Sequence, residues 1–573
     1  MMEKIIRTDM QISVRDFDRI AARRLSLAGV HPVLARVYAA RGVAEAAQLD
    51  SALSRLLHFG TLKNIQAASV RLADAITARE RILIVADYDA DGATACATAV
   101  RGFALLGLQV DYLVPNRFEY GYGLTPEIVR VAALRQPDLI ITVDNGIASI
   151  DGVQTAHELG IEVLVTDHHL PGDELPDALI VNPNQPGCNF ASKHLAGVGV
   201  MFYVLLAVRA ELLSRGQFAA DAMPNLAQLL DIVALGTVAD VVRLDDNNRI
   251  LVEQGLRRMR QGRACPGVEA LFRAANRPIE TAAAADLGFM IGPRLNAAGR
   301  LEDMSLGIAC LLSSDPLIAT GYAQRLHALN AERRAIEADM QEQALMQLET
   351  IEAADNYTLV MFDPAWHQGV IGILASRLKD KFHRPAICFA RSADGEIKGS
   401  GRSINTLHLR DALDWVAKRA PELILKFGGH AAAAGLSIRE TQLPEFMALF
   451  EAASRHFLAP EDLATQIQTD GDLPEDACTP DFAETIGAQV WGQGFPAPRF
   501  SGKFRVTGQK ILKDKHLKFQ LTAGKTGFDS ILFNRTELLP DEIDAVFELE
   551  LNRYQGRTSL QIKLHHWAGV GGI

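Results

Sequence analysis

Short apolar runs alternate with longer mixed segments between residues 80 and 185. The runs read RILIVADYD, LQVDYLVPN, DLIITVDNG, IEVLVTDHH and ALIVNPN. Each is continuously apolar rather than alternating, which is the pattern of strands buried on both faces of a parallel sheet with helices covering it. The pattern therefore predicts a doubly wound α/β fold for this part of the chain.

The rest of the chain changes pattern several times. Residues 190–300 are mainly helical, interrupted by Gly and Pro, and residues 316–352 contain no internal proline and predict one long charged helix. After it come strands and helices of a second α/β domain, in which GSGRS and GGHAAAAG supply glycine-rich turns. The last hundred residues hold short strands separated by turn residues, as in a small barrel or sandwich. The predicted domains are an N-terminal helical segment (1–54), the sheet domain with a helical insertion (55–315), the connecting helix (316–352), the second α/β domain (353–458) and the barrel (459–573).

Length and composition agree with several soluble domains. The chain has 573 residues, of which 48% are hydrophobic and 22% charged, so two to four domains are expected. No run reaches the roughly 18 apolar residues of a membrane span, and the N-terminus lacks the apolar core of a signal peptide. The six cysteines show no C-x-x-C spacing, which argues against a zinc site or a disulfide framework. We therefore expect a cytoplasmic protein without a membrane partner.

The charge is negative overall but positive in one short segment. The formal net charge is −11, so any contact with nucleic acid must come from a local patch. Residues 499–518 hold seven Lys or Arg against the single Asp514, interleaved with Phe500, Phe504 and, just beyond, Phe519. Such a run is more often a solvated face than a nucleic-acid site, and this feature alone leaves both interpretations open.

The stretch DYDADG places Asp87, Asp89 and Asp91 at every second position before a glycine. A calcium loop has this start, but its twelfth position should be Glu and is Thr98 here, and a strand-like run precedes it instead of a helix. Carboxylates this close repel one another unless a cation or several donors compensate. A catalytic metal cluster is therefore a better interpretation than a solvated turn.

Further acids and imidazoles follow other predicted strands. Asp144 directly follows the apolar run in TVDNG, and His168 and His169 end TDHH. Open α/β sheets place their active sites at the carboxyl ends of the strands, so these side chains should meet at one edge. Oxygen ligands with an imidazole suit magnesium, manganese or iron, and such a site would activate water against a phosphoryl group. Phosphoryl transfer to water is the predicted class of reaction.

The ordered motifs DYDADG, VPNRFEYGYGL, TVDNG, TDHH, GTVAD, GPRLNAAGR, HQGVIGILASRL, GSGRS and GGHAAAAG resemble those of the DHH–DHHA1 phosphoesterases. The resemblance extends over roughly residues 50–570 and is closest to the single-strand-specific 5′→3′ exonucleases of bacterial DNA repair. It implies a DHH catalytic domain, a DHHA1 nucleic-acid-binding domain and a C-terminal β-barrel domain of OB type.

The resemblance also implies roles for individual residues. Its metal cluster corresponds to Asp87, Asp89, Asp144, His168 and Asp240, with Asp91 and His169 beside it as further catalytic residues. Which two of Asp87, Asp89 and Asp91 bind metal directly stays open, because Val85 and Ala86 stand where relatives in the superfamily carry a histidine. Contacts to phosphate or DNA are implied for Arg117, Arg300, Ser400, Arg402, His367 and His430.

The implied function is a metal-dependent exonuclease that degrades single-stranded DNA to 5′-mononucleotides in recombination and repair. Two Mg²⁺ or Mn²⁺ ions would be its cofactors. Single-strand-binding protein and a RecQ-type helicase would be its partners, and the chain would be a monomer. Two alternatives are a DHH-type phosphodiesterase for short oligonucleotides or small nucleotides, and a non-catalytic scaffold that binds single strands.

Overall fold

The computed structural model describes residues 10–116, 120, 122–219, 221–350, 355–392, 395–524, 526–532, 535–554 and 557–569. The chain forms two compact units, each described here by itself. The larger unit contains Arg15–Asn330 and Asp470–Gly572, and the smaller unit contains Met1–Val14 and Ala331–Thr469. The long helix α14 (Pro316–Thr350) belongs to both, since the division falls within it.

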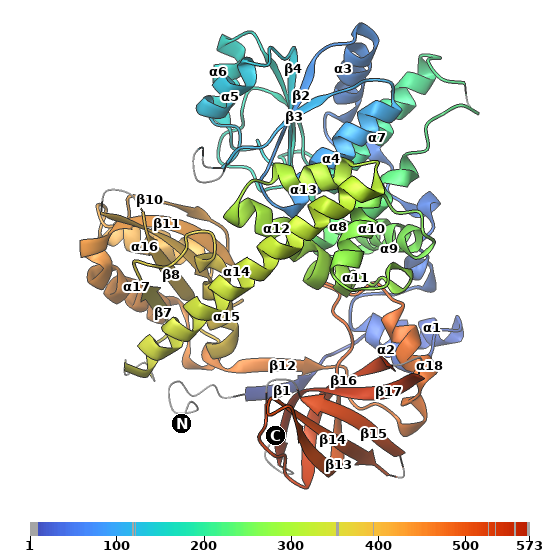
Figure 1. The fold of residues 1–573 in the computed structure, drawn as a ribbon, viewed down its shortest axis with the longest axis vertical. Helices are drawn as coiled ribbons and strands as arrows, with labels where there is room; N and C mark the ends of the chain where they lie inside the picture. The colour runs from blue at the N-terminus through green and yellow to red at the C-terminus, as the bar shows by residue number, and fades with distance from the viewer. Residues whose placement is uncertain are drawn as a thin grey trace. The chain divides into compact units, whose positions relative to one another are not determined.

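A five-stranded parallel sheet forms one end of the larger unit, with the barrel at the other (Figure 1). Its strands lie in the order β3-β2-β4-β5-β6. They are β2 (Ile82–Ala86), β3 (Asp111–Leu113), β4 (Leu139–Val143), β5 (Glu162–Thr166) and β6 (Leu179–Val181). The chain leaves β2 toward β3 and returns on the other side to β4, so the order reverses between β2 and β4. Ligands of open α/β sheets bind at such a switch point, outside the carboxyl ends of the strands.

Helices cover both faces of this sheet, as the continuous apolar runs predict. Ile82 and Ile84 of β2 pack into a core shared with the helices on one face, whereas Leu83 and Val85 pack against those on the other. The first face is covered by α3 (Ile65–Ala78), α4 (Ala90–Leu105) and α7 (Gly197–Ser214), and the second by α5 (Pro126–Ala133) and α6 (Ile150–Glu158). The predicted doubly wound fold is confirmed.

Helix α7 is long and apolar enough to cross a membrane by length and composition, but 67% of its apolar window is buried. It packs against α3 and α4, so its apolar character serves the core of the larger unit. Among the described residues no other helix meets both criteria.

The region predicted as mainly helical is helical. It contains α8 (Leu230–Ala239), α9 (Asp246–Arg260), α10 (Pro266–Ala274), α11 (Ala284–Asp286), a π-helical turn (Leu287–Ile291), α12 (Gly292–Leu301) and α13 (Ser305–Leu312). The N-terminal part of the larger unit adds α1 (Arg19–Leu27) and α2 (Pro32–Ala39).

The C-terminal part of the larger unit is a closed five-stranded barrel in the order β13-β14-β15-β17-β16. It consists of β13 (Phe500–Leu512), β14 (His516–Ala523), β15 (Thr526–Leu532), β16 (Glu542–Tyr554) and β17 (Arg557–Gly569), and α18 (Pro480–Gly487) precedes it. Arg41 holds the N-terminal helices to the segment entering the barrel through two bonds to Asp470, of 2.7 and 3.0 Å. Both side chains are 1% exposed, and a planar guanidinium suits such a two-pronged contact.

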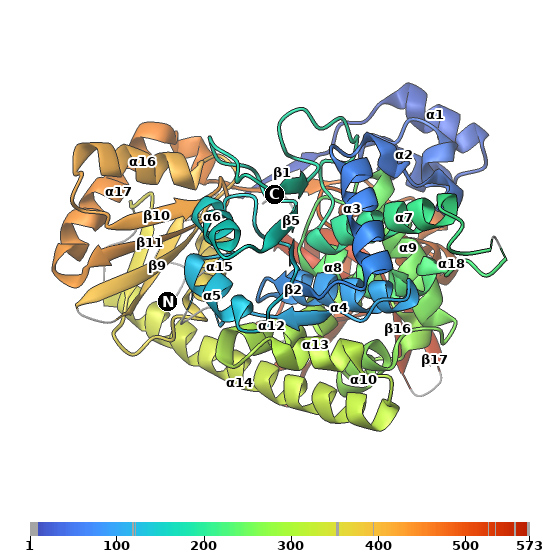
Figure 2. The same ribbon diagram turned by 90° about the horizontal axis from the view of Figure 1, so that it is seen from above.

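The smaller unit contains a mixed sheet in the order β10-β11-β9-β8-β7. Only β7 and β8 pair in parallel, and the other neighbours are antiparallel. Figure 2 shows α16 and α17 beyond one face of the sheet and α15 on the other side. The elements are β7 (Leu359–Phe362), α15 (Ile371–Phe382), β8 (Ala386–Arg391), β9 (Glu396–Arg402), α16 (Leu409–Arg419), β10 (Lys426–Gly429), β11 (Ala433–Arg439) and α17 (Leu443–Phe457). A separate parallel pair joins β1 (Met10–Val14) to β12 (Thr465–Thr469).

One local prediction is wrong: GSGRS is not a turn but the end of strand β9. A Cβ on Gly399 would lie 2.5 Å from the Phe389 ring, and one on Gly401 would lie 2.8 Å from Leu409. The glycines therefore make room for packing on the sheet and do not bend the chain. GGHAAAAG does contain a turn, because it forms the hairpin between β10 and β11.

Candidate metal centre

Three neighbouring strands each deliver an aspartate to one edge of the parallel sheet in the same way. The backbone N–H of Asp87, after β2, donates to Val143 at the end of β4 (3.3 Å). That of Asp144 donates to Thr166 at the end of β5 (3.1 Å), and that of Asp167 donates to Val181 at the end of β6 (3.2 Å). Each aspartate thus continues the backbone hydrogen bonding of the sheet by one residue past its strand. The three aspartates are therefore aligned along the carboxyl edge of the sheet.

The DYDADG turn gives its three carboxylates different neighbours. Asp89 caps helix α4 by accepting from the N–H groups of Asp91 and Gly92, at 2.9 and 3.0 Å. Asp91 reaches the start of α7, where its oxygens accept from Gly197 (2.5 Å) and Val198 (3.0 Å). Asp87 accepts from the N–H of Tyr88 at 2.8 Å. The carboxylates of Asp87 and Asp89 lie near that of Asp144, whereas Asp91 lies near His168 and Asp240.

The ring of His168 points into the carboxylates. Its Nε2 lies 3.1 Å from Asp144 Oδ1, 3.5 Å from Asp240 Oδ2 and 3.9 Å from Asp91 Oδ2. Although these atoms are close, His168 Nε2 and Asp144 Oδ1 are buried and form no hydrogen bond with any residue that the structure describes. Buried polar atoms are rarely left without a partner. Each of these two atoms carries a lone pair that faces the other, and a cation bound to both would satisfy them.

Burial and mutual repulsion raise the pKa of the clustered acids. Burial, followed by the charge of Asp89, raises the pKa of Asp91 to about 7. The pKa values of Asp144 and Asp240 are raised well above their ordinary range by burial and by the neighbouring carboxylates. Burial also lowers the pKa of His168 to about 4, so its imidazole is neutral at pH 7 and able to bind metal. Oxygen-rich donors with one imidazole fit Mg²⁺ or Mn²⁺.

The backbone around the cluster is strained and tightly packed. Asp144 has φ +63°, which is uncommon for a residue other than glycine and is often found at functional sites. A Cβ on Gly197 would lie 2.6 Å from the Asp144 carboxylate. Only glycine at this position lets the N-terminus of α7 approach both Asp144 and Asp91.

His169 stands beside the cluster in a different environment. Its Nδ1 lies 2.8 Å from Asp167 Oδ1, and its ring lies 3.3 Å from the Tyr122 hydroxyl. Burial opposes protonation of His169 and is the largest single influence, but the hydrogen bond to Asp167 and the charges of Asp167, Asp87 and Asp89 together outweigh it and raise the pKa of His169 to about 9. His168 and His169 therefore differ in charge at neutral pH, although they are adjacent in sequence and their ring centroids are 4.5 Å apart.

Several residues at this edge were missed from the sequence. They are Tyr122, Asn182, Asn184 and Asn296, of which Asn296 accepts from the N–H of Ala90 in the DYDADG turn at 2.9 Å. Asn182 and Asn184 stand at the end of the predicted strand ALIVNPN, and Asn296 lies in the motif NAAGR. These positions, at a strand end and in a motif, were the sequence features that could have pointed to the three asparagines.

The other predicted site residues of the larger unit are Arg300 and Arg117. Arg300 lies near the C-terminus of α12 and follows Gly299, where a Cβ would collide with the carbonyl of Tyr88. This close packing brings the chain at Arg300 next to the DYDADG turn. Arg117 lies outside the described residues.

The remaining predicted phosphate contacts are all in the smaller unit. Arg402 donates to Ser400 Oγ at 3.1 Å, and a Cβ on Gly372, in the first turn of α15, would lie 2.8 Å from that hydroxyl. His367 accepts from the N–H of Gly369 at 3.1 Å just before α15. His430 is exposed in the β10–β11 hairpin, next to Ala433, which pairs with Arg402. This unit therefore brings a helix N-terminus, a hydroxyl and a guanidinium together, which is a suitable arrangement for phosphate.

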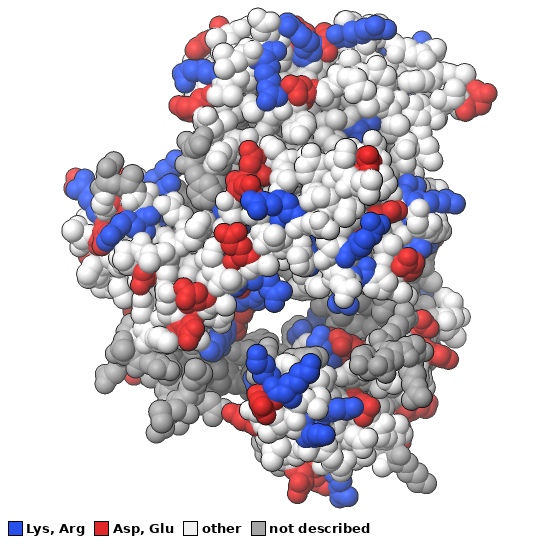
Figure 3. All heavy atoms as spheres, viewed as in Figure 1, with Lys and Arg blue, Asp and Glu red and all other residues white. Residues whose placement is uncertain are grey.

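Of the two interpretations left open for the basic segment of the barrel, the aromatic residues do not fit a nucleic-acid site. Phe500, Phe504 and Phe519 are 0%, 6% and 1% exposed, so they fill the barrel core and offer no stacking surface. Arg499 and Arg505 lie within 3.5 Å of Glu548 and Glu542 on β16, and Lys503 lies 3.9 Å from Asp544. On the face shown in Figure 3, basic and acidic side chains are interspersed over this region. The basic side chains of this segment that are not near these acids lie in the β13–β14 hairpin, where Lys510 lies opposite Lys518.

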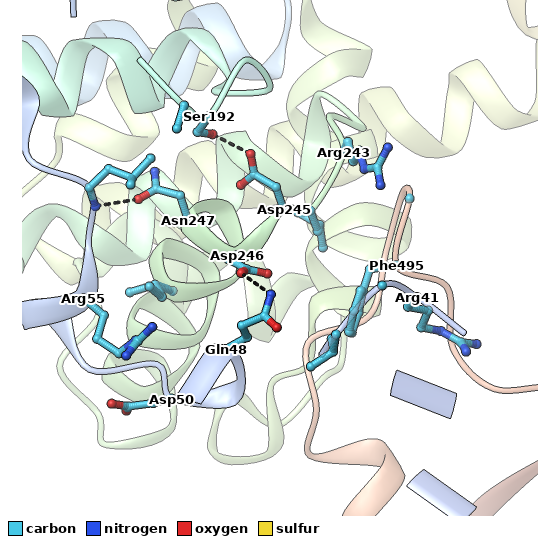
Figure 4. Close-up of a pocket in the computed structure, with 17 residues that line it drawn as sticks. Arg41, Gln48, Asp50, Arg55, Ser192, Arg243, Asp245, Asp246, Asn247 and Phe495 are labelled. Atoms are coloured by element: carbon cyan, nitrogen blue, oxygen red, sulfur yellow. Dashed lines mark hydrogen bonds between the residues drawn. The ribbon is translucent and has the colours of Figure 1, made fainter. Parts of the chain in front are cut away.

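A polar cavity of about 450 Å³ lies elsewhere in the larger unit, between the N-terminal segment, the start of α9 and the loop before the barrel (Figure 4). Its polar groups largely bond to one another: Ser192 donates to Asp245 at 2.6 Å, and Gln48 donates to Asp246 at 3.1 Å. None of the sequence-predicted site residues lines it. The cavity is thus a junction between segments, separate from the acid cluster.

Comparisons with known proteins agree with this architecture. Residues 81–237 match the family model described as "DHH family, N-terminal domain", residues 355–455 match "DHHA1 domain", and residues 469–566 match "RecJ OB domain". The single-stranded-DNA-specific exonuclease RecJ of Dickeya dadantii (strain 3937) is 49% identical over 93% of this chain and 95% of its own length. The exonuclease of the same name from Escherichia coli (strain K12) is 47% identical over 97% of this chain and 99% of its own length.

A solved structure matches the fold over nearly the whole chain. The crystal structure of RecJ from Thermus thermophilus in complex with Mn²⁺ has a TM-score of 0.82 and 30% identity, covering 99% of this chain and 81% of that chain. A second structure of that protein, in complex with Mg²⁺, has a TM-score of 0.77. These matches confirm the resemblance inferred from the motif series and the predicted fold class.

Proposed function

The chain belongs to the RecJ family of single-stranded-DNA-specific exonucleases, and from this premise we propose how its metal centre works. The protein is a metal-dependent nuclease that hydrolyses single-stranded DNA from the 5′ end and releases 5′-mononucleotides, in DNA recombination and repair. One observation carries this proposal: the buried atoms His168 Nε2 and Asp144 Oδ1 face each other at 3.1 Å without a hydrogen bond to any described residue, and four further carboxylates lie close to them.

From the chemistry of the donor set we assign the metal-binding residues. Asp87, Asp89, Asp144, His168 and Asp240 would hold two Mg²⁺ or Mn²⁺ ions. Both oxygens of Asp91 already accept from the N–H groups of Gly197 and Val198, so among the three acids of the DYDADG turn we assign direct binding to Asp87 and Asp89. When bound, the metal polarises the phosphoryl oxygens and lowers the pKa of an attacking water.

Residues beside the cluster supply orientation and a proton. Asp167 holds Nδ1 of His169 and keeps the imidazole protonated. The other ring nitrogen of His169 then carries an N–H that can donate to a phosphoryl oxygen or to the leaving oxygen. Arg117, Arg300, Ser400, Arg402, His367 and His430 are assigned to the phosphates and the strand.

Labelled strands test the reaction directly. Single-stranded DNA with a label at the 5′ or the 3′ end is incubated with the protein and Mn²⁺, and the products are resolved over time. We expect the 5′ label to appear first, in a mononucleotide, and blunt duplex DNA to resist degradation. Earlier release of the 3′ label would contradict the polarity, and equal degradation of the duplex would contradict the specificity.

Two other functions remain to be compared in the same assay. Hydrolysis confined to dinucleotides would favour a phosphodiesterase for short oligonucleotides, although the chain matches the RecJ OB domain as well as the two DHH-type domains. Binding of single strands without degradation would favour a scaffold, but the full set of acids and both histidines argues against decay of the site. From the family resemblance we further propose a cytoplasmic monomer whose partners are single-strand-binding protein and a RecQ-type helicase.

A further inference from the structure

We propose that Asn182 and Asn184 are positioning residues that clamp the main chain of the histidine pair and so fix His168 among the carboxylates. Both asparagines follow β6, whereas the histidines follow β5, its neighbour in the sheet. The inference deepens the proposed function, on which the catalytic role of the histidines rests.

One side of the histidine main chain is held by Asp167. Its Oδ1 accepts from the backbone N–H of His168 at 2.7 Å and from that of His169 at 3.1 Å. Its Oδ2 accepts from the N–H of Ile147, after β4, at 2.9 Å. Asp167 is 1% exposed, so these bonds do not compete with solvent. The N–H groups of both histidines are thereby tied, through Asp167, to the segment that follows β4.

The other side is held by the two asparagines. Asn184 Nδ2 donates to the carbonyl of His168 at 2.6 Å, and Asn182 Nδ2 donates to the carbonyl of His169 at 2.9 Å. Each histidine therefore has both its N–H and its C=O bonded to a named side chain. Such double restraint leaves little freedom for the peptide planes, so it fixes the direction in which the Cα–Cβ bond of each histidine leaves the main chain, from which the ring extends.

The clamp is itself rigid. The Oδ1 of Asn182 accepts from the backbone N–H of Asn184 at 2.7 Å, closing a turn of the kind that asparagine favours. Gln185 donates to the carbonyl of Ile180 at 2.8 Å, and Lys193 donates to that of Pro183 at 2.7 Å. Asn182 is fully buried. The two amide nitrogens are thus presented from a fixed loop.

The consequence concerns the lone pair of His168. Its Nε2 must face Asp144 and Asp240, from which it lies 3.1 and 3.5 Å away. Rotation of the His168 peptide after loss of its carbonyl bond would swing this nitrogen away from the oxygens. Partners that orient a metal-binding histidine typically change metal affinity by about ten- to a hundredfold when removed.

The test measures Mn²⁺ binding to the whole protein by titration calorimetry and by the electron paramagnetic resonance signal of free Mn²⁺. Asn184→Ala removes the donor to His168 and leaves the Asn182 turn in place. Asn184→Leu keeps the volume of the side chain and removes only the amide, which separates the lost donor from a packing defect. We expect both to weaken Mn²⁺ binding about ten- to a hundredfold, and Asn184→Gln, which restores an amide on a longer arm, to recover part of the loss.

Asn225→Ala is the matched control. Asn225 caps a short helix by accepting from the N–H of Ala227 at 3.1 Å, on an exposed loop of the same unit. Its loss should lower the melting temperature while leaving Mn²⁺ affinity unchanged. In the Asn184 variants, nuclease activity should return at high Mn²⁺ concentration, and KM for DNA should stay within twofold of the parent value.

Parent-like Mn²⁺ affinity in folded Asn184→Ala and Asn184→Leu would overturn the clamp, as would an equal loss of affinity in Asn225→Ala. The proposed function fails in a different way, because then the parent protein would not degrade single-stranded DNA at any Mn²⁺ concentration. The Mn²⁺ affinity of the Asn184 variants therefore tests the clamp whether or not the parent protein is an active nuclease.

Discussion

The two sheets of this protein present polar side chains by opposite means. The parallel sheet of the larger unit puts Asp87, Asp144 and Asp167 just past the ends of separate strands, where they are nearly fully buried. The mixed sheet of the smaller unit presents Ser400 and Arg402 from within one strand, beside the start of a helix. The first arrangement collects negative charge in a buried cluster, and the second offers a hydroxyl and a guanidinium at the surface of a unit.

The difference suggests a division of labour. Parallel strands share one carboxyl edge, so acids from distant parts of the sequence converge there with little cost in chain length. A mixed sheet has no such common edge, and its polar groups come from one strand, a hairpin and a helix N-terminus. Metal chemistry is therefore expected to depend on the larger unit, and the grip on phosphate to depend also on the smaller one.

Replacing Asp144 with Asn should have the largest effect, because it alters the acid nearest to His168 Nε2. We expect hydrolysis of single-stranded DNA to fall on the order of a thousandfold, as for the loss of one group that stabilises transition-state charge. Binding of the strand, measured by fluorescence anisotropy, should change by less than threefold. Asp151→Asn, an exposed acid in the first turn of α6, is the control. Undiminished hydrolysis in Asp144→Asn would refute the assigned cluster.

Replacing Arg402 with Ala should have the opposite profile. A charge-assisted hydrogen bond contributes about 1.5–3 kcal/mol, so KM for a 5′-phosphorylated strand should rise about ten- to a hundredfold. Affinity for Mn²⁺ should be that of the parent. Arg439→Ala, at the other end of β11, provides a matched arginine on the same sheet. A loss of Mn²⁺ affinity in Arg402→Ala would contradict the assignment of metal binding to the larger unit alone.

The stability of the metal-free protein should depend on pH through the larger unit. The pKa of Asp91 is raised to about 7, and those of Asp144 and Asp240 are also raised. In the folded state these three acids bind more protons than in the unfolded state, whereas His168, with its pKa lowered to about 4, binds fewer. The three acids outnumber the one opposing group, so their net contribution to the free energy of unfolding should fall as pH rises from about 4 to about 7, by up to about 1.4 kcal/mol per pH unit for each net proton.

Thermal unfolding in EDTA across this range checks the sign. Addition of Mn²⁺ should flatten the dependence, because a cation compensates the ionised carboxylates. Asp144→Asn should reduce the slope in the metal-free protein. Other acids with lowered pKa values, such as Asp167 and Glu548, give the opposite slope, so the parent is compared with Asp144→Asn. A difference in melting temperature between the two that does not change from pH 4 to pH 7 in EDTA would contradict the assigned pKa shifts.

The sequence predicts the parallel sheet and most of its site because each apolar run ends in a polar residue at the same edge. It does not predict the position of Asp240 by pattern, since this acid follows helix α8 and not a strand; only the motif series pointed to it. Asn182 and Asn184 were missed because an asparagine after a strand is usually a turn former. Their second role depends on contacts with β5, which no local pattern records.

The basic segment of the barrel shows why a one-dimensional pattern misleads. Phe500 and Phe504 alternate with Lys503 and Arg505, a pattern that also fits a surface for stacking and charge. In a half-buried strand the same period of two sends one set inward, and the phenylalanines are the inward set. The outward set is largely matched by acids on β16. Within residues 499–518, all of which the structure describes, the lysines of the β13–β14 hairpin remain to attract a strand.

The smallest predicted effect follows from this distribution. Lys510 lies opposite Lys518 on the β13–β14 hairpin, and like charges facing each other favour an anion between them. If this hairpin contacts one phosphate, Lys510→Ala should reduce the slope of log affinity against log salt by about 0.7, with little change in turnover. Lys503→Ala should reduce it less, because Lys503 lies near Asp544. Equal slopes for the parent and Lys510→Ala, measured by fluorescence anisotropy between about 50 and 200 mM salt, would remove the barrel hairpin from the DNA path and leave binding to the two sheets.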